Sequence, residues 1–373
     1  MRVSVLQDQF AIALKNVIKA VPTKSTVPVL SNIYLFTEDA RLYIAATDLE
    51  LSIMTWIGCK VDLHGSITLP AKTLSDLISN LSPDRVDIQV DYETQTANIR
   101  CGTTNTNIKG ISGNEYPSLP KMEEPSFMLP AQILKQRLGE VVFCTAKEMA
   151  RPVLTGVLFD MASDCITLAA ADGYRLATTQ IPVEAVPTRT MLVPNRVIEK
   201  LMSAIGDEEE IGVQIFRTNN GENIMFHLSN MAISMWLLDG KFPDFRAILP
   251  KSWNTQVEAY TEDLLNAAKR AEIFARDSSF SVRLFVRQSG TQERPSELEI
   301  VGRSQERGEA QTAMDCGARG EDLEVAINVT YLKDILNSMD AETVSFESNG
   351  STHPLVVYAP NTQYVIMPMS LNR

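Results

Sequence analysis

The sequence repeats itself on the scale of whole domains. From Arg151 to Pro182, three apolar runs are separated by polar turn residues, a pattern that predicts three strands joined by tight turns. The same pattern occurs from Val27 to Ile57, with Pro-Val-Leu before it and an Ala-rich run ending in Asp. The two aspartates, Asp48 and Asp172, lie 124 positions apart. The chain is therefore predicted to contain copies of one module.

A second pattern supports the same interpretation. The segment ITLPAKTLSDLISNL at 67–81 is matched almost position for position by MLVPNRVIEKLMSAI at 191–205, and again by VAINVTYLKDIL at 325–336. Each predicts a strand that leads into a helix with one apolar face. Repeats of this size predict consecutive domains rather than a solenoid. We expect an α+β fold of three similar domains, at 1–124, 125–251 and 252–373, each with two helices and two antiparallel sheets.

Two Pro-rich segments separate the copies. The first is NEYPSLP at 114–120 and the second is DGKFPDFRAILP at 239–250. Both are interpreted as extended linkers between domains.

Composition limits the classes of protein to consider. A length of 373 residues exceeds what one hydrophobic core usually covers. Neither a signal peptide nor an apolar run of membrane-spanning length is evident, and the five cysteines are scattered, so we expect a cytoplasmic protein with reduced thiols and no membrane contact. A net charge of −12 argues against nucleic-acid binding over the whole surface but leaves room for a local basic face.

Motifs for catalysis are absent from the sequence. The three histidines, His64, His227 and His353, have no metal-ligand spacing, and neither a phosphate-binding glycine loop nor a nucleophile elbow occurs. We therefore expect no catalytic residue, no metal and no cofactor. Asp48 and Asp172 follow predicted strands, where they suit either turn formation or acid chemistry.

The predicted helices reverse the overall sign of charge. They carry ten cations against seven acids, in a chain with an excess of acids. Cations on solvated helix faces are ordinary, but equivalent helices facing one opening would form a basic lining for a phosphate backbone. The cations are Lys15, Lys19, Lys72, Lys135, Arg137, Arg196, Lys200, Lys269, Arg270 and Lys333.

Several motifs together resemble a known family. They are VPVLSNIYL and ATDLE in the first copy, ADGYRLA and DGKFPDFRAILP in the second, and the MPM-containing C-terminal end. In this order they resemble the bacterial DNA polymerase III beta subunits, the sliding clamps. The resemblance implies the DNA clamp fold and a head-to-tail homodimeric ring around duplex DNA, without sequence preference. It implies a processivity factor for the replicative polymerase rather than an enzyme.

The resemblance also implies partners and site residues. Expected partners are the polymerase alpha subunit, the clamp loader and other clamp-motif proteins, namely repair and translesion polymerases, ligase and mismatch repair proteins. The implied DNA-binding residues are Lys24, Lys72, Lys147, Arg196 and Lys200. The implied dimer contacts are Thr106, Ile108, Ile273 and Phe274. The implied partner-peptide pocket consists of Arg151, Leu154, Ala171, Gly173, Tyr174, Arg175, Leu176, Pro243, Ala247, Ile248, Asn328, Tyr331, Pro354, Val365, Ile366, Met367, Pro368 and Met369.

Two other readings stay open from the sequence. One is an enzyme with an acidic site at Asp48 and Asp172. The other is a monomeric scaffold that meets partners through the apolar C-terminal segment without encircling DNA.

Overall fold

The structure, a computed structural model, describes residues 1–148, 150–184, 186–219, 221–250, 252–289 and 295–370. The chain forms two compact units. Unit 1 comprises Met1–Gln132 and Arg196–Leu237, and unit 2 comprises Ile133–Asn195 with the chain from Leu238 onward. Both units divide the predicted second copy between them. Every described strand pairing is antiparallel.

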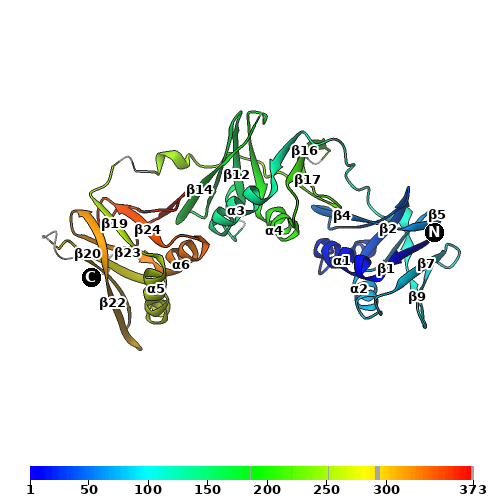
Figure 1. The fold of residues 1–373 in the computed structure, drawn as a ribbon, viewed down its shortest axis with the longest axis horizontal. Coiled ribbons are helices and arrows are strands. Elements are labelled where there is room, and N and C mark those ends of the chain that lie inside the picture. The colour runs from blue at the N-terminus through cyan, green and yellow to red at the C-terminus, as the bar shows by residue number, and fades with distance from the viewer. Residues whose placement is uncertain (149, 185, 220, 251, 290–294, 371–373) are drawn as a thin grey trace. The chain divides into compact units, whose positions relative to one another are not determined.

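Unit 1 contains two sheets with helices against them (Figure 1). Its first two helices are α1 (Gln7–Val17) and α2 (Ala71–Ser79). The five-stranded sheet has the order β5 (Lys60–Leu63), β1 (Arg2–Leu6), β7 (Arg85–Asp91), β8 (Thr96–Cys101) and β9 (Thr104–Lys109). The nine-stranded sheet has the order β10 (Ile111–Ser112), β6 (Ser66–Pro70), β2 (Asn32–Glu38), β3 (Arg41–Thr47), β4 (Leu51–Gly58), β18 (Met231–Trp236), β17 (Gly221–His227), β16 (Glu210–Thr218) and β11 (Phe127–Pro130).

The predicted apolar helix faces form the interior of unit 1. Phe10, Leu14 and Val17 of α1 are fully buried, as their spacing of three to four residues predicts, and α1 packs on β3, β4 and α2. On α2, Leu74 and Ile78 are buried in the same way. The α-helix ends earlier than the periodicity suggests, because residues 18–20 form a 3-10 turn.

Strands from two copies meet inside unit 1. β4, from the first copy, pairs with β18, from the second, with Ile53 opposite Ile233. Both side chains are buried, so the junction is part of the core. The first and second copies therefore share one sheet.

Unit 2 is built around one continuous run of strands. Its helices include α5 (Thr261–Ala275), which packs on β21, β22 and α6 (Val329–Ser338) (Figure 1). Helices α3 (Ala131–Val141) and α4 (Asn195–Ala204) lie where the chain passes between the units. The twelve-stranded order is β15 (Arg189–Pro194), β12 (Gly156–Ala162), β13 (Cys165–Ala171), β14 (Arg175–Pro182), β26 (Thr362–Ile366), β25 (Leu355–Tyr358), β24 (Thr343–Ser348), β19 (Thr255–Tyr260), β22 (Gly308–Gly320), β21 (Ser296–Ser304), β20 (Ser281–Arg287) and β23 (Leu323–Asn328).

The second and third copies also share a sheet. β14 of the second copy pairs with β26, near the C-terminal end of the third, and Leu176 lies opposite Val365. The expectation that Tyr364 to Met367 completes the last sheet is confirmed through Ile366, where β26 ends.

Two local predictions differ from the structure. The strand expected to begin at Val153 begins at Gly156, because Pro152–Leu154 form a 3-10 turn, as Pro28–Ser31 do in the first copy. Proline favours the first turn of such a helix, since its fixed φ suits that position and no N–H donor is lost there. Among the described residues, no helix is long and apolar enough to cross a membrane.

The Pro-rich linkers are anchored rather than free. Tyr116 is buried, stacks on Tyr34 at 5.0 Å between ring centroids, and accepts a hydrogen bond from the Thr47 N–H at 3.0 Å. In the second linker, Phe242 and Phe245 are buried in the core of unit 2. The turn of residues 245–247 between them and the chain that follows is a 3-10 helix.

Candidate functional site

An apolar cluster in unit 2 lies beneath most of the expected peptide pocket. Its buried members come from both the second and the third copy, and three of them, Leu154, Leu176 and Val365, belong to the expected set. Ala171 packs against the cluster from a half-buried position. The complete cluster is Leu154, Leu158, Ala169, Leu176, Leu192, Phe242, Phe245, Val356 and Val365.

Large apolar side chains from three separate segments of the expected pocket stay exposed. Tyr174 is 64% exposed, and Ile248 and Met367 are each 41% exposed. The Met367 N–H donates to the Tyr174 carbonyl oxygen at 2.9 Å, which fixes these two residues beside each other. Exposed aromatic and methionine side chains beside a buried apolar cluster are typical of a surface that binds a partner.

A tight turn presents Tyr174. Asp172 Oδ1 accepts hydrogen bonds from the Tyr174 N–H at 2.9 Å and the Arg175 N–H at 3.0 Å, while Gly173 has φ of +94°. The turn interpretation of Asp172 is thus confirmed. Asp48 does the same in the first copy, accepting from the N–H groups of Glu50 at 3.0 Å and Leu51 at 2.8 Å.

Arg175 connects the second copy to the third. Its buried guanidinium donates to Asp172 Oδ2 at 3.0 Å, to Asp334 Oδ2 on α6 at 2.6 Å and to the Phe143 carbonyl oxygen at 2.8 Å. The same group lies over the Tyr331 ring, 4.6 Å from its centroid. Arg175 is therefore occupied by bonds within the chain, and it positions Tyr331 rather than facing solvent.

Other expected pocket residues divide between surface and support. Asn328 caps α6, because its Oδ1 accepts from the Thr330 N–H at 2.9 Å. Met369 leaves the group: its N–H donates to the Ala326 carbonyl oxygen, and its side chain lines a separate cavity of about 530 Å³. The remaining members are exposed at Arg151, Gly173, Pro243 and Ala247, half-buried at Tyr331, Pro354 and Pro368, and buried at Ile366. Residues 371–373, which extend past this segment, lie outside the described residues.

The sequence did not identify four residues that support this site. Phe143 and Asp334 hold Arg175, and Phe242 and Phe245 fill the apolar cluster. The two aromatic residues of the linker were a usable signal, since a linker free in solvent has no need of them. Asp334 gave none, because it lies 159 residues from Arg175 in the chain.

The expected DNA-binding lysines occupy equivalent loops. Lys24 is exposed between two 3-10 turns in the first copy, and Lys147 is exposed between the corresponding turns in the second. Lys72 is exposed on α2. All three ammonium groups are thus accessible to a phosphate, although the fold alone does not require one there.

A cluster of cations marks unit 1. The pKa of Lys19 is lowered because burial disfavours its charged form and because Lys200 and Lys15 repel it. Arg196, on α4, instead donates to Asp48 and lies 3.7 Å from Glu50. Lys15, Lys19 and Lys200 are therefore a local excess of positive charge, whereas Arg196 is partly neutralised.

The expected dimer contacts lie at sheet edges. β9, which contains Thr106 and Ile108, is the outer strand of its sheet. β22 pairs with β21 through residue 316 but with β19 only from Gly317, and α5, which carries Ile273, packs beside it. Ile273 is 51% exposed, Phe274 and Thr106 are half-buried, and Ile108 is buried in its own sheet.

The described titratable groups do not form a reactive centre. No cluster of described His, Cys, Asp and Glu side chains could hold a metal ion. Burial raises the pKa of all five thiols, to about 11 at Cys316, so they stay protonated at neutral pH. His227 lies 2.9 Å from Gln214 Oε1, and burial lowers its pKa.

Comparison with known proteins gives one consistent result. Three family models match in order: the DNA polymerase III beta subunit N-terminal domain at residues 1–120, its central domain at 128–244 and its C-terminal domain at 246–370. The chain is 31% identical to the beta sliding clamp of Haemophilus influenzae, over 97% of this chain and all of that protein. It is 27% identical to the beta sliding clamp of Bacillus subtilis, over 98% of each.

Solved structures agree with the sequence relatives. The crystal structure of the Bacillus subtilis DNA polymerase sliding clamp matches all of both chains with a TM-score of 0.93 at 24% identity. A Pseudomonas aeruginosa sliding clamp bound to griselimycin matches all of both chains with a TM-score of 0.91 at 26% identity.

Proposed function

Because this chain belongs to the DNA polymerase III beta subunit family, the beta sliding clamps, we propose which of its surfaces carry the work of a clamp. The family is a non-catalytic processivity subunit, so the chain serves DNA replication by holding polymerase on DNA and catalyses no reaction. The observation that carries this function is the match of all three family models, in order, along nearly the whole chain.

The first proposed surface is a partner-peptide pocket on unit 2. Tyr174, Ile248 and Met367 supply exposed apolar contacts, and the buried cluster beneath them supplies a rigid floor. A short apolar peptide segment gains most of its binding energy from a few such anchors in a preformed groove. The expected partners are the polymerase alpha subunit, the clamp loader, repair and translesion polymerases, ligase and mismatch repair proteins.

The second proposed surface binds duplex DNA through phosphates alone. Lys24 and Lys147 in equivalent loops, Lys72 on α2, and Lys200 with its neighbours supply the positive charge. Contacts of this kind position DNA but read no sequence, which suits a protein that slides. Arg196 would join them only by exchanging its bonds to Asp48 for a phosphate.

The third proposed surface closes a head-to-tail dimer. β9 of one protomer and the open part of β22 of its partner offer unpaired strand edges, and the exposed Ile273 lies beside the latter. Two identical contacts of this heterologous kind close a ring of six similar domains. We place the assembled protein in the cytoplasm, where its DNA lies. The domain boundaries 1–124, 125–251 and 252–373 belong to the same proposal.

Retention on circular DNA tests this function. Assembled by a clamp loader on nicked circular duplex, the protein should remain bound through gel filtration and be lost when the circle is cut. Lys24→Glu with Lys147→Glu should shorten retention and lower the salt dependence by about 0.9 per lost phosphate contact. The control pair Lys121→Glu with Lys241→Glu makes the same charge change at other exposed lysines. Equal retention on circular and linear DNA would contradict encirclement.

A further inference from the structure

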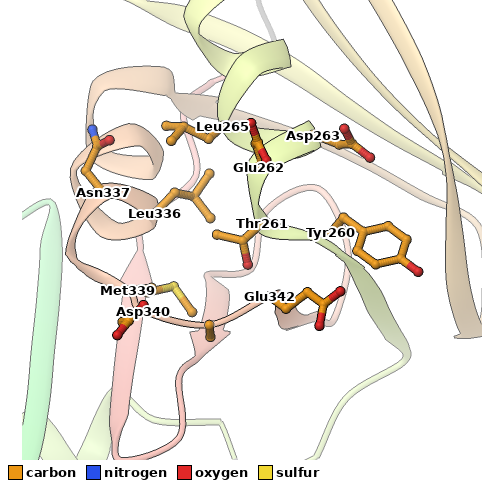
Figure 2. Close-up of a pocket in the computed structure, with 11 residues that line it drawn as sticks. Tyr260, Thr261, Glu262, Asp263, Leu265, Leu336, Asn337, Met339, Asp340 and Glu342 are labelled. Carbon is orange, nitrogen blue, oxygen red and sulfur yellow. The ribbon is translucent and has the colours of Figure 1, made fainter.

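A second pocket lies on unit 2, away from the residues of the peptide pocket. It has a volume of about 590 Å³ and is formed by the start of α5, the end of α6 and the loop that leads into β24. Figure 2 shows Thr261 with Leu336 and Met339 on one side and Glu342 and Tyr260 on the other. The pocket is lined by Tyr260, Thr261, Glu262, Asp263, Leu265, Leu336, Asn337, Met339, Asp340, Ala341 and Glu342.

The lining is acidic and carries no basic side chain. Four of the eleven residues are carboxylates, Glu262, Asp263, Asp340 and Glu342, and all four are exposed. None of them forms an ion pair with a described residue. Glu262 and Asp263 also stabilise the first turn of α5 through the helix dipole, but the two loop carboxylates have no such role. The pocket therefore presents uncompensated negative charge.

A buried hydroxyl in the same pocket lacks a partner. Thr261 is 7% exposed, and its Oγ1 makes no hydrogen bond within the structure, although its N–H donates to the Glu342 carbonyl oxygen at 2.9 Å. In Figure 2 this hydroxyl points to the space between Met339 and Glu342. A buried polar atom without a partner is costly, so the bare hydroxyl is suited to an incoming donor.

The remaining lining residues suit the stem of a long cationic side chain. Leu265, Met339 and Leu336 provide apolar surface, and Tyr260 exposes an aromatic ring at the rim. Lys and Arg bury their methylene stems against such surface and place the charged end beside carboxylates or an aromatic face. The volume suffices for such a side chain with the backbone around it.

We propose that this pocket binds a basic segment of a partner protein, with one Lys or Arg side chain inserted toward Thr261. The charged end takes hydrogen bonds to the Thr261 hydroxyl and the loop carboxylates, and the rim carboxylates attract the neighbouring positive charges. A metal ion is not the occupant, because the described carboxylates include no group of three that converges on one point. The site is separate from the apolar peptide pocket, so one protomer could hold a partner at both.

A direct binding experiment tests the proposal. A fluorescein-labelled peptide, GKRKG, is titrated with the full-length protein, and anisotropy is compared with that of GQQQG. Asp340→Asn with Glu342→Gln should weaken GKRKG binding at least tenfold in low salt. The control pair Asp39→Asn with Glu93→Gln removes the same charge from exposed positions of unit 1 and should change the affinity less than twofold. Equal losses in the two pairs, or no binding of GKRKG, would overturn the proposal.

Thr261→Val separates binding from folding. Valine has nearly the shape of threonine but no hydroxyl, so removing an unpartnered group should leave the melting temperature unchanged or higher. The same variant should bind GKRKG several-fold more weakly. A lower melting temperature with unchanged peptide affinity would show that the hydroxyl serves the fold instead, and would refute its place in the site.

Discussion

Single side chains decide which surfaces of this protein are available to partners. Arg175 and Met367 are both among the expected pocket residues, and their β-strands are neighbours in one sheet. Arg175 is 8% exposed and satisfied by three acceptors, whereas Met367 is 41% exposed with only its backbone held. The first residue therefore maintains the site, and the second is free to make contacts.

Truncation of Met367 tests the pocket at this scale. Met367→Ala should weaken binding of a polymerase-derived clamp-motif peptide about tenfold, since a truncated anchor residue typically costs more than 1 kcal/mol. Peptide affinity is measured by calorimetry on the full-length protein. Met128→Ala, at a 44% exposed methionine of unit 1, is the matched control and should leave affinity unchanged. A similar loss in both variants would contradict the assignment.

Lys19 gives a prediction with a defined pH dependence. Its folded-state pKa lies below the ordinary value of 10.5, so the folded state binds fewer protons there and stability rises with pH in that range. The charged group thus lowers stability at neutral pH, and this penalty disappears above about pH 10.5. Lys19→Gln should raise the melting temperature at pH 7, with the gain fading toward pH 10.5.

The same substitution should weaken DNA binding, because a phosphate would relieve the repulsion among Lys15, Lys19 and Lys200. Thermal melts from pH 7 to 10.5 and a DNA titration measure both effects. A lower melting temperature at pH 7 would show that Lys19 stabilises the free protein.

Among the elements, α6 depends on a residue outside its own copy. Its Tyr331 and Asp334 both contact Arg175, which lies on β14 of the second copy. Because two carboxylates and one carbonyl share this guanidinium, its removal leaves Asp172 almost buried without its counter-ion. The orientation of α6 against β14 is therefore set by one planar cation.

Arg175→Ala should lower the free energy of unfolding by about 3 kcal/mol, the order expected when one partner of a buried ion pair is removed. Arg175→Lys should recover only part of this, because lysine cannot reproduce the planar fork. Urea denaturation followed by circular dichroism measures the change. Arg246→Ala removes an exposed pair with Asp160, and should cost less than about 1 kcal/mol. Comparable losses at both arginines would contradict the importance of burial.

Local periodicity predicted the elements well, but it could not predict how the copies join. The apolar spacing of α1 and the strand–helix openings at 67–81, 191–205 and 325–336 appear in the structure as expected. The pairings β4–β18 and β14–β26 join strands more than 170 residues apart, and neither leaves a local signal. In the site, the residues named from family resemblance are a mixture of exposed contacts and buried supports, which only tertiary burial separates.

For the whole molecule, assembly should depend on the exposed edge of the third copy. Ile273→Asp should shift the protein from dimer to monomer in analytical ultracentrifugation, because a charge in a closing interface is costly to desolvate. Ile12→Asp is the matched control: Ile12 is 63% exposed on α1 and lies outside the proposed interface. A dimer that persists with Ile273→Asp would remove this residue from the interface, and a monomeric parent protein would contradict the ring.

The sharing of sheets across copies limits how a chain of this kind can be shortened. A cut at residue 124 would strip β18 from β4 and leave the buried Ile53 and Ile233 facing water on separate fragments. The sequence repeat and the cooperative folding unit are thus out of phase by half a copy. Recombination that deletes or adds one copy must break two sheets unless both new edges match, so the count of three is protected by the hydrogen bonds at its own internal seams.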